Sequence, residues 1–323
     1  MEWGRFEAAR EVLPKYLRKT RLTRAASLER NSEQKVFLKL ENELPTGSFK
    51  VRGAIYALSL HEQRGGTREV VASSTGNHGA AVAYAAKLLG WRARIFLPEK
   101  NNPVKRKNIK RLGAAIEEKG TADLAEAFGA ASAYAEKTGA FLLNDATDGD
   151  LPAGPGTIAC EIGEQLPDAD TIYVPMGDSA LIRGVAAAAK QISRDVKIIG
   201  VQSERAPSYF LSWKEGRAIE TGSCDTIADG LATRTPVAAN VQAIRELVDE
   251  VVLVSEEEML RAIGRLAIDE HIVAEPAGAA ATAAFLRNGN KIGRRPVLLV
   301  TGANISPEIL EKALAFYGSA KNS

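Results

Sequence analysis

Several features are scarce in this 323-residue sequence, and each absence removes a class of function. The two cysteines, Cys160 and Cys224, are too few for a disulfide framework, which favours a reducing cytoplasm. The three histidines, His61, His78 and His271, lie far apart, and none stands at metal-ligand spacing with a cysteine. The formal net charge is only +2, so the sequence offers no strong field for binding nucleic acid or a membrane surface.

Long hydrophobic runs and the common catalytic motifs are also absent. No stretch approaches the roughly 20 apolar residues of a membrane span, and the first residues lack the apolar core of a signal peptide. We find neither a G-x-G-x-x-G after a predicted strand nor a G-x-x-x-x-G-K-[ST] phosphate loop. The sequence therefore predicts a cytoplasmic protein without a nucleic-acid or membrane partner.

Short β-branched runs alternate with longer alanine-rich segments of helical spacing. This alternation is typical of an α/β fold whose parallel strands are covered on both faces. Ser255–Glu258 has the pattern of a capping box. We expect helices at 80–89, 122–136, 182–192 and 259–269, and strands at 36–40, 70–73, 93–97, 141–143, 171–174, 197–201, 251–254 and 297–300.

Three glycine-bearing turns stand between a predicted strand and a predicted helix: Ser73–His78, Gly154–Thr157 and Pro175–Ala180. Unpaired N–H groups and the helix dipole make such a turn suitable for a phosphate or a carboxylate. Strand-to-helix turns are also rich in glycine for purely geometric reasons, so each turn alone is weak evidence. The length predicts about two domains, with Gly65-Gly66 and Gly149–Gly156 as candidate hinges.

Lys50 follows a Pro-Thr-Gly-Ser turn and is predicted to lie in the first turn of a helix, beside Phe49. The positive end of the helix dipole and the lack of acids nearby in the sequence favour its neutral amine. A neutral amine is the form that reacts with an aldehyde cofactor. The alternative is an ordinary solvated lysine on an amphipathic helix.

The segment Pro45–Lys50, P-T-G-S-F-K, followed by V-R-G-A, resembles the cofactor-lysine segment of the tryptophan-synthase-like (fold type II) pyridoxal-phosphate enzymes. The similarity is greatest to the threonine dehydratase and serine racemase group. Further blocks follow in the family's order, at 74–79 (S-T-G-N-H-G), 154–161 (G-P-G-T-I-A-C-E), 226–230 (T-I-A-D-G), 251–258 (V-V-L-V-S-E-E-E), 275–278 (E-P-A-G) and 301–304 (T-G-A-N).

The resemblance implies a two-domain α/β fold with twisted, mostly parallel sheets and helices on both faces. Residues 1–64 and 150–323 would form a large cofactor-binding domain, and residues 65–149 a small mobile one. A homodimer that acts on a small amino acid is also implied.

The resemblance also implies roles toward pyridoxal 5'-phosphate. Lys50 would hold the cofactor and move the substrate's Cα proton, Asn77 would bond to the ring hydroxyl, and Thr301 would meet the pyridine nitrogen. The full predicted cofactor set is Phe49, Lys50, Asn77, Gly177, Asp178, Ser179, Ala180, Leu181, Glu275 and Thr301, in which residues 177–181 would cradle the phosphate.

The predicted substrate set is the loop that would bind the α-carboxylate: Ser74, Thr75, Gly76, Asn77 and His78. Thr75 is a second predicted catalytic residue, at a position where racemases of this group commonly have serine. Threonine keeps the hydroxyl but has a stiffer side chain. Racemisation is therefore a weaker prediction than elimination.

The sequence departs from the family pattern at several positions. Gly177–Ala180 replaces a run of four glycines, so we expect Ala180 to alter the loop backbone and the Asp178 carboxylate to point away from the phosphate. Gln202 and Ser208 stand where related racemases have acidic metal ligands, so no metal site is predicted. We interpret Asn144–Asp150 as a solvated loop, the alternative being a specificity loop for a substrate with extra donors or positive charge.

The predicted function is a β-elimination that converts a 3-hydroxy amino acid, such as threonine or serine, to a 2-oxo acid and ammonia. The alternatives are an amino-acid racemase or β-replacement enzyme of the same fold, and a binding protein of this fold that has lost catalysis.

Overall fold

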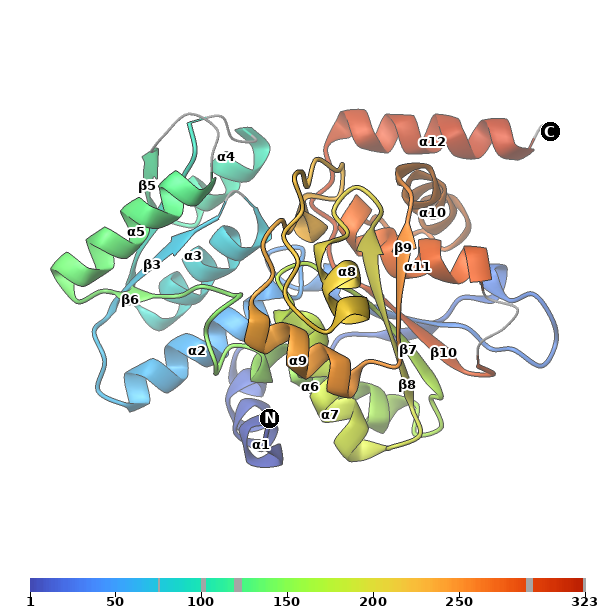
Figure 1. Cartoon of the computed structure of the whole chain (residues 1–323), viewed down its shortest axis with the longest axis horizontal. Coiled ribbons are helices and arrows are strands. Elements are labelled where there is room, and N and C mark those ends of the chain that lie inside the picture. The colour runs from blue at the N-terminus through green and yellow to red at the C-terminus, as the bar shows by residue number, and fades with distance from the viewer. Residues whose placement is uncertain (75, 100–102, 119–123, 289–292, 322–323) are drawn as a thin grey trace.

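The computed structural model describes residues 1–74, 76–99, 103–118, 124–288 and 293–321, whose strands form two sheets (Figure 1). The six-stranded sheet has the order β1-β2-β10-β7-β8-β9. Only β1 runs antiparallel to its neighbour, and the other pairs are parallel. The strands are β1 (Leu22–Arg24), β2 (Phe37–Leu40), β7 (Thr171–Pro175), β8 (Lys197–Ser203), β9 (Glu250–Val254) and β10 (Pro296–Val300).

The four-stranded sheet has the order β5-β4-β3-β6, and all its pairs are parallel. It lies at one end of the molecule, with β3 in register with both neighbours: Val70 pairs with Ala93 on one side and with Phe141 on the other (Figure 1). Its strands are β3 (Glu69–Ser73), β4 (Arg92–Leu97), β5 (Ala115–Glu118) and β6 (Phe141–Leu142).

Helices connect most of the strands. They are α1 (Trp3–Val12), α2 (Lys50–Gln63), α3 (Asn77–Leu89), α4 (Pro103–Arg111), α5 (Leu124–Thr138), α6 (Ala153–Gln165), α7 (Ala180–Ile192), α8 (Ser208–Glu215), α9 (Ala238–Leu247), α10 (Glu256–Asp269), α11 (Pro276–Asn288) and α12 (Pro307–Lys321). None of the helices among the described residues is long and apolar enough to cross a membrane.

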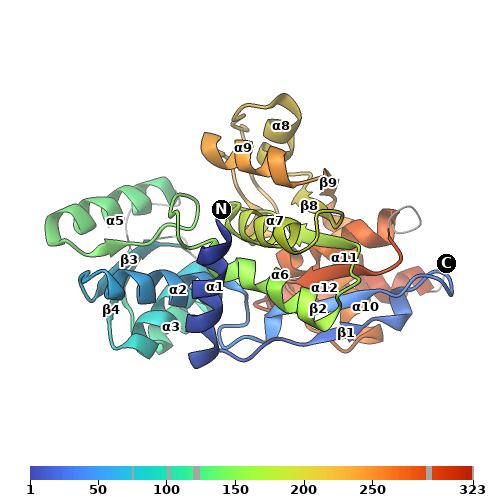
Figure 2. The same cartoon turned by 90° about the horizontal axis from the view of Figure 1, so that it is seen from below.

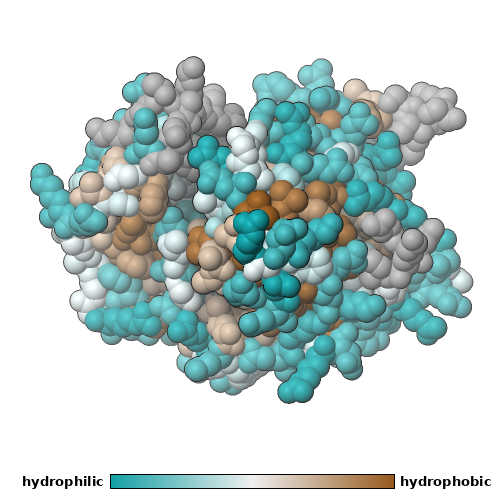
Figure 3. Space-filling view, viewed as in Figure 1, coloured by the Kyte–Doolittle hydropathy of each residue, from teal (hydrophilic) through white to brown (hydrophobic). Residues whose placement is uncertain are grey.

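Helices cover both faces of each sheet (Figures 1 and 2). Successive strand residues point to opposite faces. Val70 and Ala72 accordingly pack in one core with α3, while Val71 packs with α5 in another. The same alternation divides the large sheet, where Ile172 lies with α6 and α7, and Tyr173 lies with α10 and α11. The face seen in Figure 3 is mostly hydrophilic, with hydrophobic side chains exposed near its centre.

The predicted α/β fold is confirmed, with all eight expected strands and all four expected helices present within a few residues. The expected start of α5 at residue 122 lies outside the described residues. The expected capping box is formed: Ser255 Oγ accepts from the Glu258 N–H at 3.2 Å, and Glu258 Oε2 accepts from the Ser255 N–H at 2.8 Å. The strands β1 and β5 were missed because both are short edge strands of mixed polarity.

Gly154–Thr157 does not form a loop at the predicted site. These residues begin α6 and are buried against α2, where a Cβ on Gly154 would lie 2.5 Å from the Arg52 carbonyl oxygen. This turn was therefore wrongly grouped with the anion-binding candidates, since its glycines serve close packing. The proposed division into 1–64 with 150–323 and 65–149, with its two hinges, stays a prediction.

A charged network is buried beneath α2 and α6. The Arg52 side chain is only 2% exposed and donates to Glu41 Oε2 at 2.7 Å, Glu161 Oε1 at 2.7 Å and Thr157 Oγ1 at 3.0 Å. Lys39 Nζ also donates to Glu161, at 2.5 Å. This network joins β2, α2 and α6, and its member Arg52 lies two residues after Lys50 on α2.

Candidate active site

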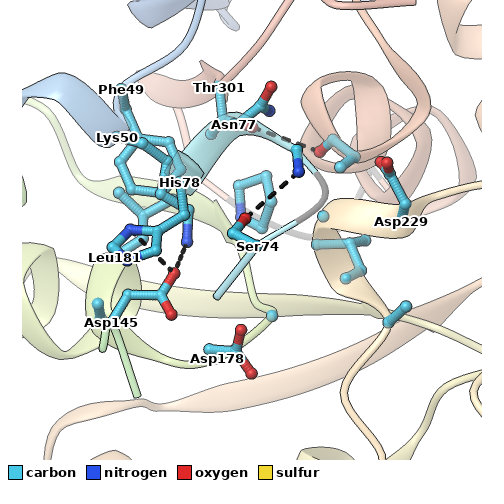
Figure 4. A pocket seen from close by; sticks show the side chains of 18 of the residues that line it. Phe49, Lys50, Ser74, Asn77, His78, Asp145, Asp178, Leu181, Asp229 and Thr301 are labelled. Atoms are coloured by element: carbon cyan, nitrogen blue, oxygen red, sulfur yellow. Dashed lines mark hydrogen bonds and ion pairs between the residues drawn. The ribbon is translucent and has the colours of Figure 1, made fainter. Parts of the chain in front are cut away.

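A cavity of about 140 Å³ lies between the two sheets, where the carboxyl ends of parallel strands meet. It is lined by residues that follow β3, β7 and β10, together with the start of α2 (Figure 4). Every described residue of the predicted sets lines it: Phe49, Lys50, Ser74, Gly76, Asn77, His78, Gly177, Asp178, Ser179, Ala180, Leu181, Glu275 and Thr301. Thr75 lies outside the described residues.

Two backbone contacts to the end of β10 hold Lys50 in the cavity. The Phe49 N–H donates to the Thr301 carbonyl oxygen at 3.1 Å, and Ser48 forms an isolated bridge with Gly302. Lys50 is then the first residue of α2. The turn before it is thus fixed to a central strand, and the amine has a defined position.

The prediction of a neutral Lys50 amine, based on a lack of nearby acids, is wrong. Its Nζ forms an ion pair with Asp145 Oδ2. Burial disfavours the charged ammonium, but the carboxylates of Asp145 and Asp178 outweigh it and hold the pKa of Lys50 above its ordinary value of 10.5. The sequence around Lys50 contains none of these acids, and the fold delivers them from other loops.

The interpretation of 144–150 as a solvated loop is also wrong for Asp145. Its side chain is buried, with 8% of the residue exposed, and it lines the cavity wall beside Lys50 (Figure 4). Asp148 has a local role instead: its Oδ1 accepts the N–H groups of Asp150 and Leu151 at 2.9 and 2.7 Å. Asp145 is therefore a site residue that the predicted sets omit.

Asn77 begins α3 and connects the two sheets across the cavity. Its Nδ2 donates to Glu275 Oε1 at 2.5 Å, and its Oδ1 accepts from Asn304 Nδ2 at 2.8 Å. Space is tight here, because a Cβ on Gly302 would lie 2.1 Å from Glu275 Oε1. The Asn77 side chain is thus held at the cavity wall by residues of the large sheet.

The predicted phosphate loop lies at the start of α7, where the first N–H groups have no partner inside the helix. A Cβ on Gly177 would lie 2.2 Å from the Gly230 carbonyl oxygen, which explains the glycine there. Ala180 is the first residue of α7, and the residue before it, Ser179, has a φ of +74°. The left-handed residue of this loop is therefore the N-cap Ser179, and the expected difference from the family's loop backbone stays a prediction.

Asp178 lies in this loop, and its Oδ1 accepts from Thr233 Oγ1 at 3.0 Å. Burial and the neighbouring Asp145 carboxylate raise the pKa of Asp178 above its ordinary value. That its carboxylate points away from a bound phosphate stays a prediction.

Ser179 provides a test of this strained loop. Ser179→Gly and Ser179→Ala both remove the hydroxyl, which accepts from Arg183 Nε at 3.1 Å. Only glycine adopts a φ of +74° without a steric penalty of about 1–2 kcal/mol. We therefore expect the glycine variant to be the more stable of the two by about 1 kcal/mol, after allowance for the greater unfolded-state entropy of glycine. Urea unfolding measures the difference, and an alanine variant of equal or higher stability would contradict it.

The cavity lining also includes residues that the predicted sets missed, from the segment between α8 and α9, which contains a short 3₁₀ helix, and from α11. They are Asp229, Gly230, Leu231, Ala232 and Ala277. Asp229, Gly230 and Ala277 lie in two of the blocks that carry the family resemblance, 226–230 and 275–278. Those blocks were the sequence signal that could have identified these three residues.

No cluster of three acidic, histidine or cysteine side chains suited to a metal ion occurs in the described part of the chain. Gln202 Oε1 accepts the Phe210 N–H at 3.0 Å, and the Ser208 hydroxyl donates to the Thr233 carbonyl at 2.6 Å. Both side chains thus have partners within the fold.

The groups around the cavity fit pyridoxal phosphate. Lys50 provides an amine that can condense with an aldehyde, and the start of α7 provides backbone donors for a phosphate. The Asn77 amide and Thr301, a buried residue directly after β10, also line the cavity. The roles of the individual residues toward the cofactor stay predictions.

Comparison with known proteins agrees with this arrangement. Residues 13–302 match the family described as pyridoxal-phosphate dependent enzyme. An L-threonine ammonia-lyase from Thermotoga maritima is 36% identical over 306 residues, which cover 95% of this chain and 76% of that protein. Maize serine racemase is 29% identical with a TM-score of 0.90, over 99% of this chain and 98% of that one. The processed form of threonine deaminase isoform 2 from Solanum lycopersicum is 29% identical with a TM-score of 0.91, over 98% and 88%. By its sequence and its fold, this chain belongs to the pyridoxal-phosphate dependent enzymes, and its fold is that of fold type II.

Proposed function

We propose that this enzyme is a dehydratase that acts on a 3-hydroxy amino acid such as L-threonine or L-serine and releases a 2-oxo acid and ammonia. The observation that carries the proposal is the Lys50 amine, fixed at the start of α2 in a cavity that also contains Asn77 and the start of α7. The name of the Thermotoga maritima relative, L-threonine ammonia-lyase, supports the same reaction. We further propose a cytoplasmic homodimer.

Several groups of this chain would have separate roles in the proposed reaction. When bound, pyridoxal phosphate would supply electron withdrawal that weakens the Cα–H bond. Lys50 Nζ would take the Cα proton, and the backbone of 74–78 would bind the α-carboxylate at the start of α3. The N–H groups at the start of α7 would hold the phosphate, and Thr301 would place a neutral hydroxyl at the ring nitrogen.

A substrate panel tests the reaction. The purified holoprotein is incubated with L- and D-threonine, L- and D-serine, 3-hydroxyaspartate and phenylserine, and 2-oxo acid release is measured. We expect release from L-threonine or L-serine. Inversion of the amino acid without 2-oxo acid release would instead support the racemase alternative, as in maize serine racemase. A protein that binds no pyridoxal phosphate would contradict both.

A further inference from the structure

Among the described carboxylates that line the cavity, Asp145 is the one that forms an ion pair with Lys50. Its Oδ2 contacts Lys50 Nζ, and the same oxygen lies 3.8 Å from His78 Nδ1. The two other carboxylates that act on Lys50 have different partners, since Asp178 accepts from Thr233 and Glu275 accepts from Asn77. Asp145 is therefore the acid in direct contact with the reactive amine (Figure 4).

His78 lies on the other side of the Asp145 carboxylate. Its Nε2 lies 3.0 Å from the Leu143 carbonyl oxygen, which only accepts hydrogen bonds, so Nε2 carries a hydrogen. The other ring nitrogen, Nδ1, then faces Asp145 Oδ2 at 3.8 Å. The oxygen that contacts Lys50 thus lies between two nitrogen atoms.

The backbone holds Asp145 in this place from both sides. Asn144 Oδ1 accepts the N–H groups of Ala146 and Thr147 at 2.9 and 3.1 Å. The Ala146 carbonyl accepts from Asn240 Nδ2 at 2.8 Å and from Arg183 Nη2 at 3.3 Å. The carboxylate is thus built into the cavity wall by residues of α7 and α9, and it is not a chance contact of a free loop.

We propose that Asp145 is the acid of the elimination step, passing the proton that Lys50 takes from Cα to the hydroxyl that leaves Cβ. This inference rests on the proposed dehydratase function. The Cα–H bond breaks and its proton goes to Lys50 Nζ, then to Asp145, then to the β-oxygen. The Cβ–O bond breaks with its electron pair on oxygen, the electrons of the Cα–H bond form the Cα–Cβ double bond, and water leaves.

At rest Asp145 is an ionised carboxylate. Burial favours the neutral acid, but the neighbouring His78 and Lys50 side chains outweigh it and lower the pKa of Asp145. Asp145 is therefore free to accept a proton from Lys50, and it holds that proton only while passing it to the β-oxygen.

The dependence on the leaving group provides the test. Hydroxide needs a proton to leave, whereas chloride does not. For Asp145→Asn holoenzyme we expect elimination from L-serine to fall about 100-fold or more, as for the loss of a general acid. Elimination from β-chloro-L-alanine should fall less than about tenfold. The matched control is Asp148→Asn in the same loop, which keeps the accepting Oδ1 and should leave both rates unchanged.

A second measurement does not depend on turnover. Asp145 stabilises positive charge on Lys50, so in Asp145→Asn the visible absorbance of the bound cofactor should titrate at lower pH than in the wild type. If the asparagine variant fails to bind cofactor, Asp145→Ser replaces it, and the ratio of the two substrate rates is compared again.

The outcomes separate the two proposals. If Asp145→Asn reduces the rates on L-serine and β-chloro-L-alanine by the same factor, the role of Asp145 as the acid is overturned. An unshifted titration of the cofactor absorbance, together with unchanged rates on both substrates, would overturn it as well. A wild-type holoenzyme that eliminates from neither substrate would overturn the dehydratase function itself.

Discussion

Lys50→Ala is expected to abolish both the visible absorbance of the cofactor-loaded protein and its turnover. The loss of turnover should be on the order of a thousandfold or more, as for other residues that form the covalent bond to a reacting group. Lys50 is the amine held at the start of α2 within the cavity, and no other lysine lines the cavity in the described part of the chain. Absorbance spectroscopy and 2-oxo acid release measure the two effects.

Lys87→Ala is the matched control, because Lys87 is an exposed lysine near the end of α3. It should keep both signals. A Lys50→Ala protein that retains turnover would falsify the assignment of this lysine. Loss of absorbance together with unchanged affinity for some other partner would instead support a binding protein of this fold.

Arg52→Met is expected to lower the free energy of unfolding by about 3–5 kcal/mol, the usual cost of removing one partner from a buried ion pair. Arg52 is buried between Glu41 and Glu161, and methionine fills much of its volume without neutralising either carboxylate. Urea unfolding followed by circular dichroism measures the loss. A change below about 1 kcal/mol, typical of an exposed pair, would contradict the buried network.

Arg64→Met is the control for this variant, because Arg64 pairs with Asp150 with 61% of its side chain exposed. Its cost should stay below about 1 kcal/mol. The pH dependence gives a second readout. Burial raises the pKa of Glu161, but Arg52 and Lys39 outweigh it and hold that pKa below its ordinary value of 4.5. Its contribution to stability is therefore complete above pH 4.5 and lost as the pH falls through the lower folded value, and this loss should be smaller in Arg52→Met.

The elements of the fold were predictable because the strands are nearly continuous apolar runs. Val297–Val300 and Thr171–Val174 are buried on both faces in the centre of the large sheet, so their composition alone indicates them. The strand Ala115–Glu118 lies at an edge and carries two glutamates, so its composition resembles that of a loop.

The residues of the candidate site were predictable from motifs, but their electrostatics were not. The motif around Lys50 placed it in the cavity correctly, yet its charge state depends on Asp145, which lies 95 residues away along the chain. Similarly, an altered backbone was predicted for the loop at the start of α7, but the sequence did not indicate that Ser179 would be its left-handed residue. Contacts between distant loops determine both properties, and local sequence patterns do not contain them.

The two hydrogen bonds of Asn77 have a consequence for access to the cavity. Asn77 lies on α3, beside the small sheet, whereas Glu275 and Asn304 belong to the large-sheet side. Any separation of the two halves breaks both bonds, at a net cost of about 0.5–1.5 kcal/mol each. Asn77 therefore resists separation of the two sheets on either side of the cavity. A molecule that offered Asn77 a replacement partner would offset this cost, so that binding in the cavity and separation of the two sheets would be energetically coupled.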